Sequence, residues 1–453
     1  MKILNIIYIH THDTGRLVSA YGYGVPTPEY QAFCQDAILF QNAFSVAPTC
    51  SPSRASLLTG VYPHQNGMLG LAQRGFKLDK RLHLARYLRD HGYETALCGV
   101  QHEIGYYTDH ALAVDNLGYQ RDLTTDSSQY DEEHLVEWDN HNADKLANWF
   151  DERTDTQPFF VSFGMHATHR QYPQTIAKDI AVSSARPPLN VANDPETRQD
   201  FAAFETSAEY ADHNLKVVLD ALKRNGLYEK TIIVLTTDHG VAFPFAKCTL
   251  TDSGIGVLMA IRVPGCVPAE YNGLLSQIDV IPTLLDLVNL EKPNYLEGKS
   301  FAPIFDGNEY KGDDYVFGEV NFHTSYEPIR SVRSKRYKYI RYFDDYEHLN
   351  LSNIDNSPTK TFYAQEGLRE VTKPKEALYD LYYDVMETNN LLDDPRYLAQ
   401  LTNMRQRLSD FMVRTEDPLL NGPIPIQSSW KVNKREAYSA HAKDKSEYEN
   451  LPE

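Results

Sequence analysis

Residues 231–240 read TIIVLTTDHG, a β-branched apolar run of strand length that passes directly into Asp238, His239 and Gly240. The first three fifths of the chain contain four more runs of this kind, ILNIIYI (3–9), YETALCG (93–99), PFFVSFGM (158–165) and VLMAIRV (257–263). Near-continuous apolar strands are typical of a parallel sheet that is covered on both faces. Residues 231–240 therefore predict a buried strand whose carboxyl end carries polar side chains.

Helix signals separate these runs. Residues 27–37 begin with Thr27 as N-cap and Pro28 in the first helical position, and residues 79–92 and 196–226 each end on a glycine. The alternation predicts an α/β domain with a mostly parallel central sheet over residues 1–312. Because ligands of such sheets gather at the carboxyl ends of the strands, we expect the chemistry at that edge.

The sequence changes in character after residue 312. Tyrosine-rich alternating segments are followed by a helical pattern over residues 395–415. We predict a smaller C-terminal α+β domain with an antiparallel sheet over residues 313–453, and we expect its polar tail, residues 434–453, to be a loosely held arm.

Composition limits the classes of function. The 453 residues are 42% hydrophobic and carry a net charge of −18, which argues against nucleic-acid or acidic-membrane binding. No apolar run is long enough to span a membrane, and the start MKILNIIYIHTHD lacks a signal-peptide cleavage site. Five scattered cysteines do not suggest a disulfide framework. We therefore expect a reducing, cytoplasmic setting; the sequence leaves open whether the protein is a homo-oligomer.

Cys50 lies in the segment PTCSPSRASLLTG (48–60), which predicts a helix that ends at Gly60. At the N-terminus of that helix, free amides and the helix dipole favour negative charge. Arg54 lies one turn further on, and its spacing predicts that it leans back over Cys50. This arrangement suits an anion site. From these residues alone, Cys50 could still be an inert core residue, a metal ligand, one half of a disulfide or a nucleophile.

The pattern C-x-P-x-R followed by ASLLTG resembles the signature of the type I sulfatases, which belong to the alkaline phosphatase superfamily. The resemblance implies an alkaline phosphatase-like three-layer sandwich. It also implies that a formylglycine-generating maturation enzyme converts Cys50 to formylglycine, whose hydrated aldehyde is the nucleophile.

The same resemblance implies a divalent metal site. Sulfatases carry two aspartates after the first strand; Asp13 matches the second of them, and His12 replaces the first. Asp238 and His239 match the second metal pair of the family. The family usually holds Ca²⁺, which we expect here, with Mn²⁺ second because imidazole favours transition metals.

The remaining site residues follow from the same resemblance. It places His102 beside the nucleophile, His169 opposite the sulfate ester as a proton donor and Lys247 as a second sulfate-binding cation beside Arg54. Arg170 and His323 are expected to contact the substrate, and His166 is a weaker candidate. Val100 stands where the family has a lysine, so one sulfate contact is lost.

Over nearly the whole chain the sequence is most similar to the heparan N-sulfatase branch, through segments such as DHGVAFPF (238–245) and IRSVRSKRYKYIR (329–341). The expected substrate is therefore an N-sulfoglucosamine-like sulfated mono- or oligosaccharide, cleaved at a sulfate ester or sulfamate. Two alternatives remain. One is a phosphatase or phosphonate monoester hydrolase of the same superfamily, favoured by His239 and Val100. The other is a non-catalytic relative that binds sulfated sugars.

Overall fold

The computed structural model describes residues 4–105, 114 and 116–452. Its largest element is an eight-stranded sheet in the order β5-β4-β6-β1-β7-β8-β2-β9. The strands are β1 (Asn5–Thr11), β2 (Ile38–Phe40), β4 (Glu94–Gly99), β5 (Arg121–Asp122), β6 (Phe159–Gly164), β7 (Thr231–Thr237), β8 (Met259–Arg262) and β9 (Ala269–Tyr271). The five strands from β5 to β7 are parallel, whereas β8 is antiparallel to both of its neighbours.

The register at the centre of the sheet determines where the site lies. β1 is paired with β7 from Asn5↔Thr231 to Thr11↔Thr237, and with β6 up to His10↔Gly164. The three strands therefore end nearly level, and the polar residues that follow them emerge at the same edge.

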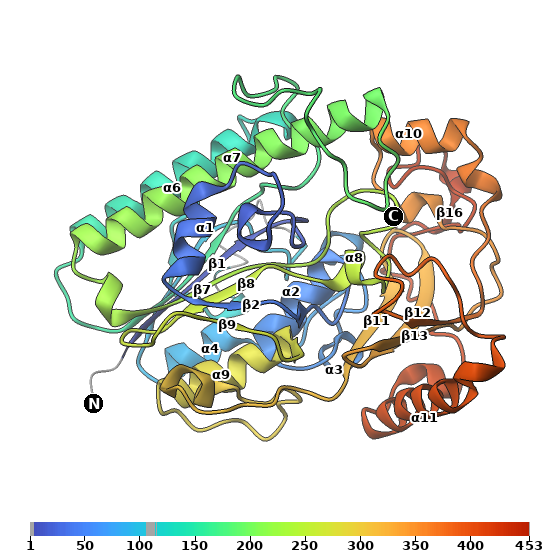
Figure 1. The fold of residues 1–453 in the computed structure, drawn as a ribbon. Helices are drawn as coiled ribbons and strands as arrows, with labels where there is room; N and C mark the ends of the chain where they lie inside the picture. The colour runs from blue at the N-terminus through green and yellow to red at the C-terminus, as the bar shows by residue number, and fades with distance from the viewer. Residues whose placement is uncertain (1–3, 106–113, 115, 453) are drawn as a thin grey trace.

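Helices cover both faces of this sheet (Figure 1). Ile7 and Ile9 of β1 pack with α1 (Pro28–Gln35), α6 (Leu135–Glu152) and α7 (Pro195–Arg224) in one apolar cluster. Ile6 and Tyr8 point the other way and pack with α2 (Cys50–Thr59), α4 (Leu84–Asp90) and α9 (Val280–Leu287). Because alternate residues of the strand enter two different clusters, the sheet is buried on both faces. The predicted three-layer fold is confirmed.

Most of the predicted helix ends agree with the structure, but α4 begins at Leu84 and not at residue 79, because residues 80–82 form a separate 3₁₀ turn. α1 begins at Pro28, directly after Thr27, and α7 begins at Pro195, one residue before the expected segment. α2 extends from Cys50 to Thr59, and Gly60 follows it with φ +71°, a conformation that glycine adopts readily. Cys50 is thus the first residue of its helix.

The C-terminal part has a four-stranded antiparallel sheet made of β11 (Val316–Phe322), β12 (Tyr326–Arg333), β13 (Tyr337–Tyr342) and β14 (Glu376–Asp380). Phe322 and Leu408, the latter from α11 (Leu398–Arg414), share an apolar cluster with Val46 and Met68 of the N-terminal part. The small sheet, its helix and their place beside the large sheet are visible in Figure 1. The boundary at residues 312/313 stays a prediction.

The prediction of a loosely held tail was wrong for most of residues 434–453. β15 (Val432–Asn433) pairs with β16 (Tyr448–Asn450). The buried guanidinium of Arg74 donates to Asn433 Oδ1 and to the carbonyl oxygen of Ala440 (2.9 and 2.6 Å). A buried cation needs such acceptors, so the polar tail is fixed by a contact far away in the sequence.

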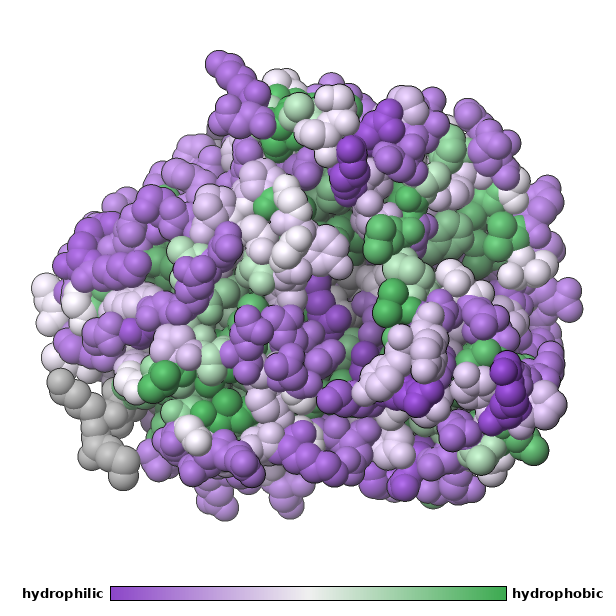
Figure 2. All heavy atoms as spheres, viewed as in Figure 1, coloured by the Kyte–Doolittle hydropathy of each residue, from purple (hydrophilic) through white to green (hydrophobic). Residues whose placement is uncertain are grey.

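Among the described residues, no helix is long and apolar enough to cross a bilayer. Figure 2 shows one face of the molecule, on which hydrophilic residues predominate and hydrophobic residues form separate small patches. The surface seen there agrees with the ordinary composition of the chain.

A buried charge network joins the two parts of the molecule. His64, in α3 (Pro63–Asn66), contacts Glu319 of β11, and Arg330 of β12 holds Asp417 through two hydrogen bonds. Burial would raise the pKa of Glu319, but His64 and Arg330 outweigh it and lower this pKa to about 2. Burial would likewise lower the pKa of His64, and Glu319 raises it instead.

We expect Glu319→Gln to lower the free energy of unfolding at pH 7 by about 3 kcal/mol, because it leaves buried cations without a partner. The folded pKa of Glu319 lies below 4.5, the ordinary value for a glutamate. Its carboxylate therefore stabilises the fold above that value, and this contribution is lost as the pH falls toward 2. Urea unfolding from pH 6 to pH 3 should show a steeper loss of stability in the wild type than in the variant. In the wild type, His64 adds no pH dependence over this range, since its contribution is fully present below pH 6.5.

The matched control is Asp314→Asn, which breaks an exposed pair with Lys311 and should change stability by less than about 0.5 kcal/mol. Parallel pH dependences for wild type and Glu319→Gln would contradict the prediction.

Candidate active site

The site lies where β1 and β7 end and α2 begins. Asp13 follows β1 with φ +53°, a left-handed conformation that is uncommon for a residue with a side chain. Its backbone N–H donates to Asp238 Oδ1 (2.9 Å), so the two turns after β1 and β7 are tied together. Both carboxylates are at most 1% exposed. The predicted metal residues are therefore brought together as buried neighbours.

Cationic and imidazole groups surround these two carboxylates. His12 Nδ1 lies 2.9 Å from Asp13 Oδ1 and 3.2 Å from Asp238 Oδ2, while Lys247 Nζ donates to Asp13 Oδ2 (2.7 Å). Burial would raise the pKa of both aspartates. Lys247 and His239 instead hold the pKa of Asp13 well below its usual range. The pKa of Asp238 is lowered in the same way by His239 and Arg54. Both groups are therefore ionised in the folded protein.

His239 has the hydrogen-bonding pattern of a metal ligand. Its Nδ1–H donates to the carbonyl oxygen of Gly240 (2.9 Å), which leaves the lone pair on Nε2. Nε2 lies 3.2 Å from Asp13 Oδ1 and 3.4 Å from Cys50 Sγ. A backbone carbonyl that accepts from the other ring nitrogen and so fixes the tautomer is typical of metal-bound histidines.

The arrangement fits a divalent cation. Ligand atoms of His12, Asp13, Cys50 and Asp238 all lie within 4.8 Å of one another. Asp238 Oδ2 is buried and accepts no hydrogen bond from the described residues, although Arg54 Nη2 is 3.1 Å away. Two ionised carboxylates and a neutral imidazole nitrogen form a mixed oxygen and nitrogen donor set. This donor set can bind calcium, although calcium prefers a set made of oxygen atoms alone. It can also bind manganese, which accepts imidazole nitrogen.

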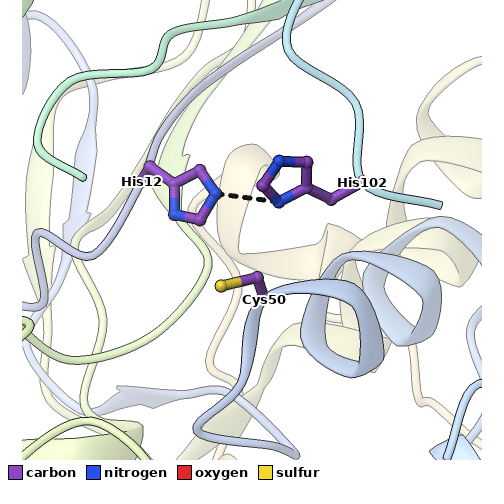
Figure 3. Close-up of side chains that lie close together, drawn as sticks. All are labelled: His12, Cys50 and His102. Carbon is purple, nitrogen blue, oxygen red and sulfur yellow. Dashed lines mark hydrogen bonds between the residues drawn. The ribbon is translucent and has the colours of Figure 1, made fainter. Parts of the chain in front are cut away.

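Cys50 lies beside this cluster and next to two histidines (Figure 3). Its thiol is 3.9 Å from Asp13 Oδ1, and His12 Nε2 is 2.9 Å from His102 Nδ1. Nitrogen atoms of both rings lie within 4.8 Å of the sulfur. Burial raises the pKa of the Cys50 thiol well above its usual range. The predicted nucleophile position, the metal cluster and His102 thus share one small volume.

Arg54 does not lean over Cys50 as its spacing suggested. Its guanidinium reaches the end of β1, where Nη1 contacts His10, Nη2 donates to the carbonyl oxygen of Thr11 (3.0 Å), and Nη2 lies 3.1 Å from Asp238. Arg54 therefore contacts Asp238, whereas Lys247 contacts Asp13.

Val100, which stands where the family has a lysine, is buried and offers no charge.

Lys247 is held in place by an irregular turn. Phe245 and Cys248 have φ values of +65° and +66°, and Cys248 N–H donates to the carbonyl oxygen of Pro48, two residues before Cys50. Besides Asp13, Lys247 Nζ contacts Asp355 Oδ2 of the C-terminal part (2.9 Å). Sequence reasoning missed Asp355, because its segment NIDNSP (353–358) has the composition of an ordinary loop.

The other predicted histidines lie around the same centre. His169 Nε2 is 4.0 Å from Asp13 Oδ2. The ring of His166 lies tilted beside the ring of His169, with 5.2 Å between the two centroids. His323 is buried, its Nδ1 has no hydrogen-bond partner, and burial together with Lys247 lowers its pKa to about 3. His323 is therefore neutral at physiological pH.

Arg170 is engaged elsewhere. Its guanidinium forms a bidentate pair with Asp200 of α7 (2.7 and 2.9 Å), and its Nε donates to the carbonyl oxygen of Ala242 (2.8 Å). These bonds fasten the loop after β6 to α7. The contact with substrate expected for Arg170 stays a prediction, and these bonds do not favour it.

Comparison with known protein families gives two matches. The model of the family described as Sulfatase matches residues 4–290, and the model described as N-sulphoglucosamine sulphohydrolase, C-terminal, matches residues 239–377. The first match covers more than half of the chain.

Individual relatives agree with these models. The N-sulphoglucosamine sulphohydrolase of Homo sapiens is 28% identical over 482 aligned residues, which cover 92% of each chain. A solved 2-O GAG sulfatase superposes with a TM-score of 0.71 at 22% identity and covers 94% of this chain and 95% of its own. The phosphonate monoester hydrolase of Agrobacterium radiobacter has the same fold, with a TM-score of 0.68 at 19% identity, covering 94% and 100%.

We expect Asp13→Asn and Asp238→Asn each to reduce the divalent metal bound to the purified protein by at least about tenfold, because each removes an ionised ligand from the cluster. Metal content is measured by inductively coupled plasma mass spectrometry after dialysis. Asp345→Asn, which alters an exposed carboxylate, is the control and should retain wild-type metal content. Unchanged metal content in both site variants would contradict the assignment.

Proposed function

Given that the chain belongs to the sulfatase family and is a sulfuric ester hydrolase, we propose that it removes sulfate from a small sulfated saccharide, with N-sulfoglucosamine as the first candidate. One observation carries the proposal. Cys50, at the position that sulfatases mature to formylglycine, is the first residue of α2. Its Sγ lies 3.9 Å from Asp13 Oδ1 and 3.4 Å from His239 Nε2. The reacting group and the cation site are thus neighbours.

Two groups would supply the central chemistry when present. Formylglycine at position 50 would supply a hydrated aldehyde as nucleophile. A divalent cation held by Asp13, Asp238, His239 and His12 would act as Lewis acid and as template for the sulfate oxygens.

The side chains of the protein divide the remaining work. Arg54 and Lys247 provide fixed positive charge on either side of the aspartate pair, where negative charge develops on the sulfate oxygens. His102, backed by His12 at 2.9 Å, is placed to take a proton from the group at position 50.

His169 is suited to protonating the departing oxygen or nitrogen. Its Nδ1–H donates to the carbonyl oxygen of Arg170, so Nε2 faces the aspartate pair and, in the imidazolium form, carries the proton that would be donated. Its side chain is 27% exposed, so incoming solute can reach it. A group at the opening is well placed to act on the leaving group, whereas buried groups act on the sulfate.

The proposal of an N-sulfated substrate rests on the C-terminal match and on the human relative. The net charge of −18 favours a mono- or oligosaccharide over a long polyanion. The related 2-O GAG sulfatase acts at a different position, so a panel of N-, 2-O- and 6-O-sulfated glucosamines is the appropriate test. The highest kcat/KM is expected with the N-sulfated sugar.

The second candidate is phosphate or phosphonate ester hydrolysis, which the shared fold of the Agrobacterium enzyme and Val100 keep open. We expect kcat/KM for 4-nitrophenyl sulfate to exceed that for 4-nitrophenyl phosphate by at least about 100-fold. The same preparation and pH serve both assays. A preference for the phosphate would overturn the proposal.

Maturation of Cys50 is a separate expectation. Peptide mapping of residues 44–74 from protein made together with a formylglycine-generating enzyme should show replacement of the thiol sulfur by an aldehyde oxygen. Cys50→Ala should lower kcat by at least about 1,000-fold. Cys34→Ala, which changes a buried cysteine of α1, is the matched control and should leave kcat within threefold. Full activity in Cys50→Ala would contradict the proposed nucleophile.

The identity of the ion is tested by reconstitution. We propose Ca²⁺ as the resident ion, with Mn²⁺ as the alternative because His239 Nε2 faces the cluster. After chelation, Ca²⁺ should restore activity at lower concentration than Mn²⁺, and metal analysis should find Ca²⁺ in the reconstituted protein. The reverse order would assign manganese.

We propose the cytoplasm as the location of the protein. The proposal is supported by its five cysteines, which are all free, as is usual in a reducing compartment.

A further inference from the structure

Two polar side chains of the site are partly exposed. The side chains of His169 and Asp355 are 27% and 18% exposed. The side chain of Lys247 is only 3% exposed, and its Nζ is 2.9 Å from Asp355 Oδ2. The carboxylate of Asp355 is therefore a partly exposed neighbour of the cation proposed to bind the sulfate.

Asp355 is held rigidly from one side by Asn353. Asn353 Oδ1 accepts hydrogen bonds from the backbone N–H groups of Thr324 and Ser325 (3.0 Å each). Its Nδ2 donates to Glu327 Oε2 (2.9 Å). These bonds attach the loop of Asp355 to the turn that follows His323.

Lys360 holds the loop from the other side. Its buried Nζ donates to the carbonyl oxygen of Ile354 (2.7 Å) and to Asn356 Oδ1 (3.0 Å), the residues on either side of Asp355. A third bond goes to the carbonyl oxygen of Tyr438 in the C-terminal tail (2.7 Å). A carboxylate placed by this many buried bonds is preorganised, as recognition groups are.

His323 adds a second polar group from the same part of the molecule. It is 5% exposed, and its Nδ1 has no hydrogen-bond partner among the described residues. A buried polar atom without a partner is costly unless a ligand completes it. The C-terminal part thus presents an acceptor at Asp355 and an unpaired imidazole nitrogen at His323 on the side of Lys247.

We propose that Asp355 is a specificity-determining residue, which accepts hydrogen bonds from hydroxyl groups of the sugar while Lys247 binds the sulfate. The inference rests on the proposed function and adds how the saccharide part is recognised. A site built to hydrogen-bond hydroxyl groups discriminates strongly against substrates that lack them. The carboxylate also repels a second anionic substituent beside the hydroxyl that it binds, so neutral neighbouring positions are favoured.

The test compares two substrates in one variant. Asp355→Asn keeps the size of the side chain but removes its charge and half of its acceptor capacity. We expect kcat/KM for N-sulfoglucosamine to fall at least tenfold, mainly through KM, because a hydrogen bond to a charged group is lost. Activity on 4-nitrophenyl sulfate, which has no sugar hydroxyl, should change less than threefold. Asp345→Asn, an exposed carboxylate of the same part of the chain, should change neither.

Two results would overturn the inference. An equal loss on both substrates would mean that Asp355 acts only by positioning Lys247, and no loss on either would mean that it does not act on the substrate. Thermal melting checks that the variant is folded, and Asp355→Ser serves if Asp355→Asn is not. Failure of the proposed function is distinguishable, because the wild type itself would then cleave no sulfated saccharide.

Discussion

Two aspartates, Asp13 and Asp238, are buried side by side at the ends of β1 and β7, and the rest of the site is arranged to balance their charge. The strands are paired in register up to Thr11↔Thr237, so the two carboxylates that follow cannot separate. Two buried like charges are unfavourable unless cations compensate them. Arg54 and Lys247 supply the positive charge from different elements of the fold, and His12 and His239 add polar imidazole contacts. A divalent cation between the carboxylates would complete the balance.

The central sheet and its helices could be predicted because their signals are local. Buried parallel strands need apolar side chains on both faces, and such runs are visible without knowing their neighbours. Thr27, Pro28 and Gly60 define helix ends by backbone preferences that act over a few residues. The tail could not be predicted in this way. Its structure depends on Arg74, more than 350 residues earlier, whose buried guanidinium needs the tail carbonyls.

The same distinction explains the site. Residues that directly follow strands, such as Asp13 and Asp238, were predictable because the fold brings strand ends together. The sequence identified Arg54 as a residue of the site but predicted the wrong contact for it. Helical spacing suggested a contact with Cys50, whereas the charge of Asp238 attracts the guanidinium. Asp355 gave no signal, because a loop aspartate acquires its role only from the long-range contact with Lys247.

The division of the site between the two parts of the chain has a physical consequence. The groups proposed to act on the sulfate lie before residue 248 and follow strands of the large sheet or belong to its helices and loops, whereas Asp355 and His323 come from the C-terminal part. Apolar packing of Phe322 against Met68, together with the His64–Glu319 contact, holds that part against the segment after α2. If Asp355 recognises the saccharide as proposed, changes in the C-terminal loops alter which saccharide is accepted. Lys247, which contacts both Asp13 and Asp355, then links this recognition to the charge balance around the aspartate pair.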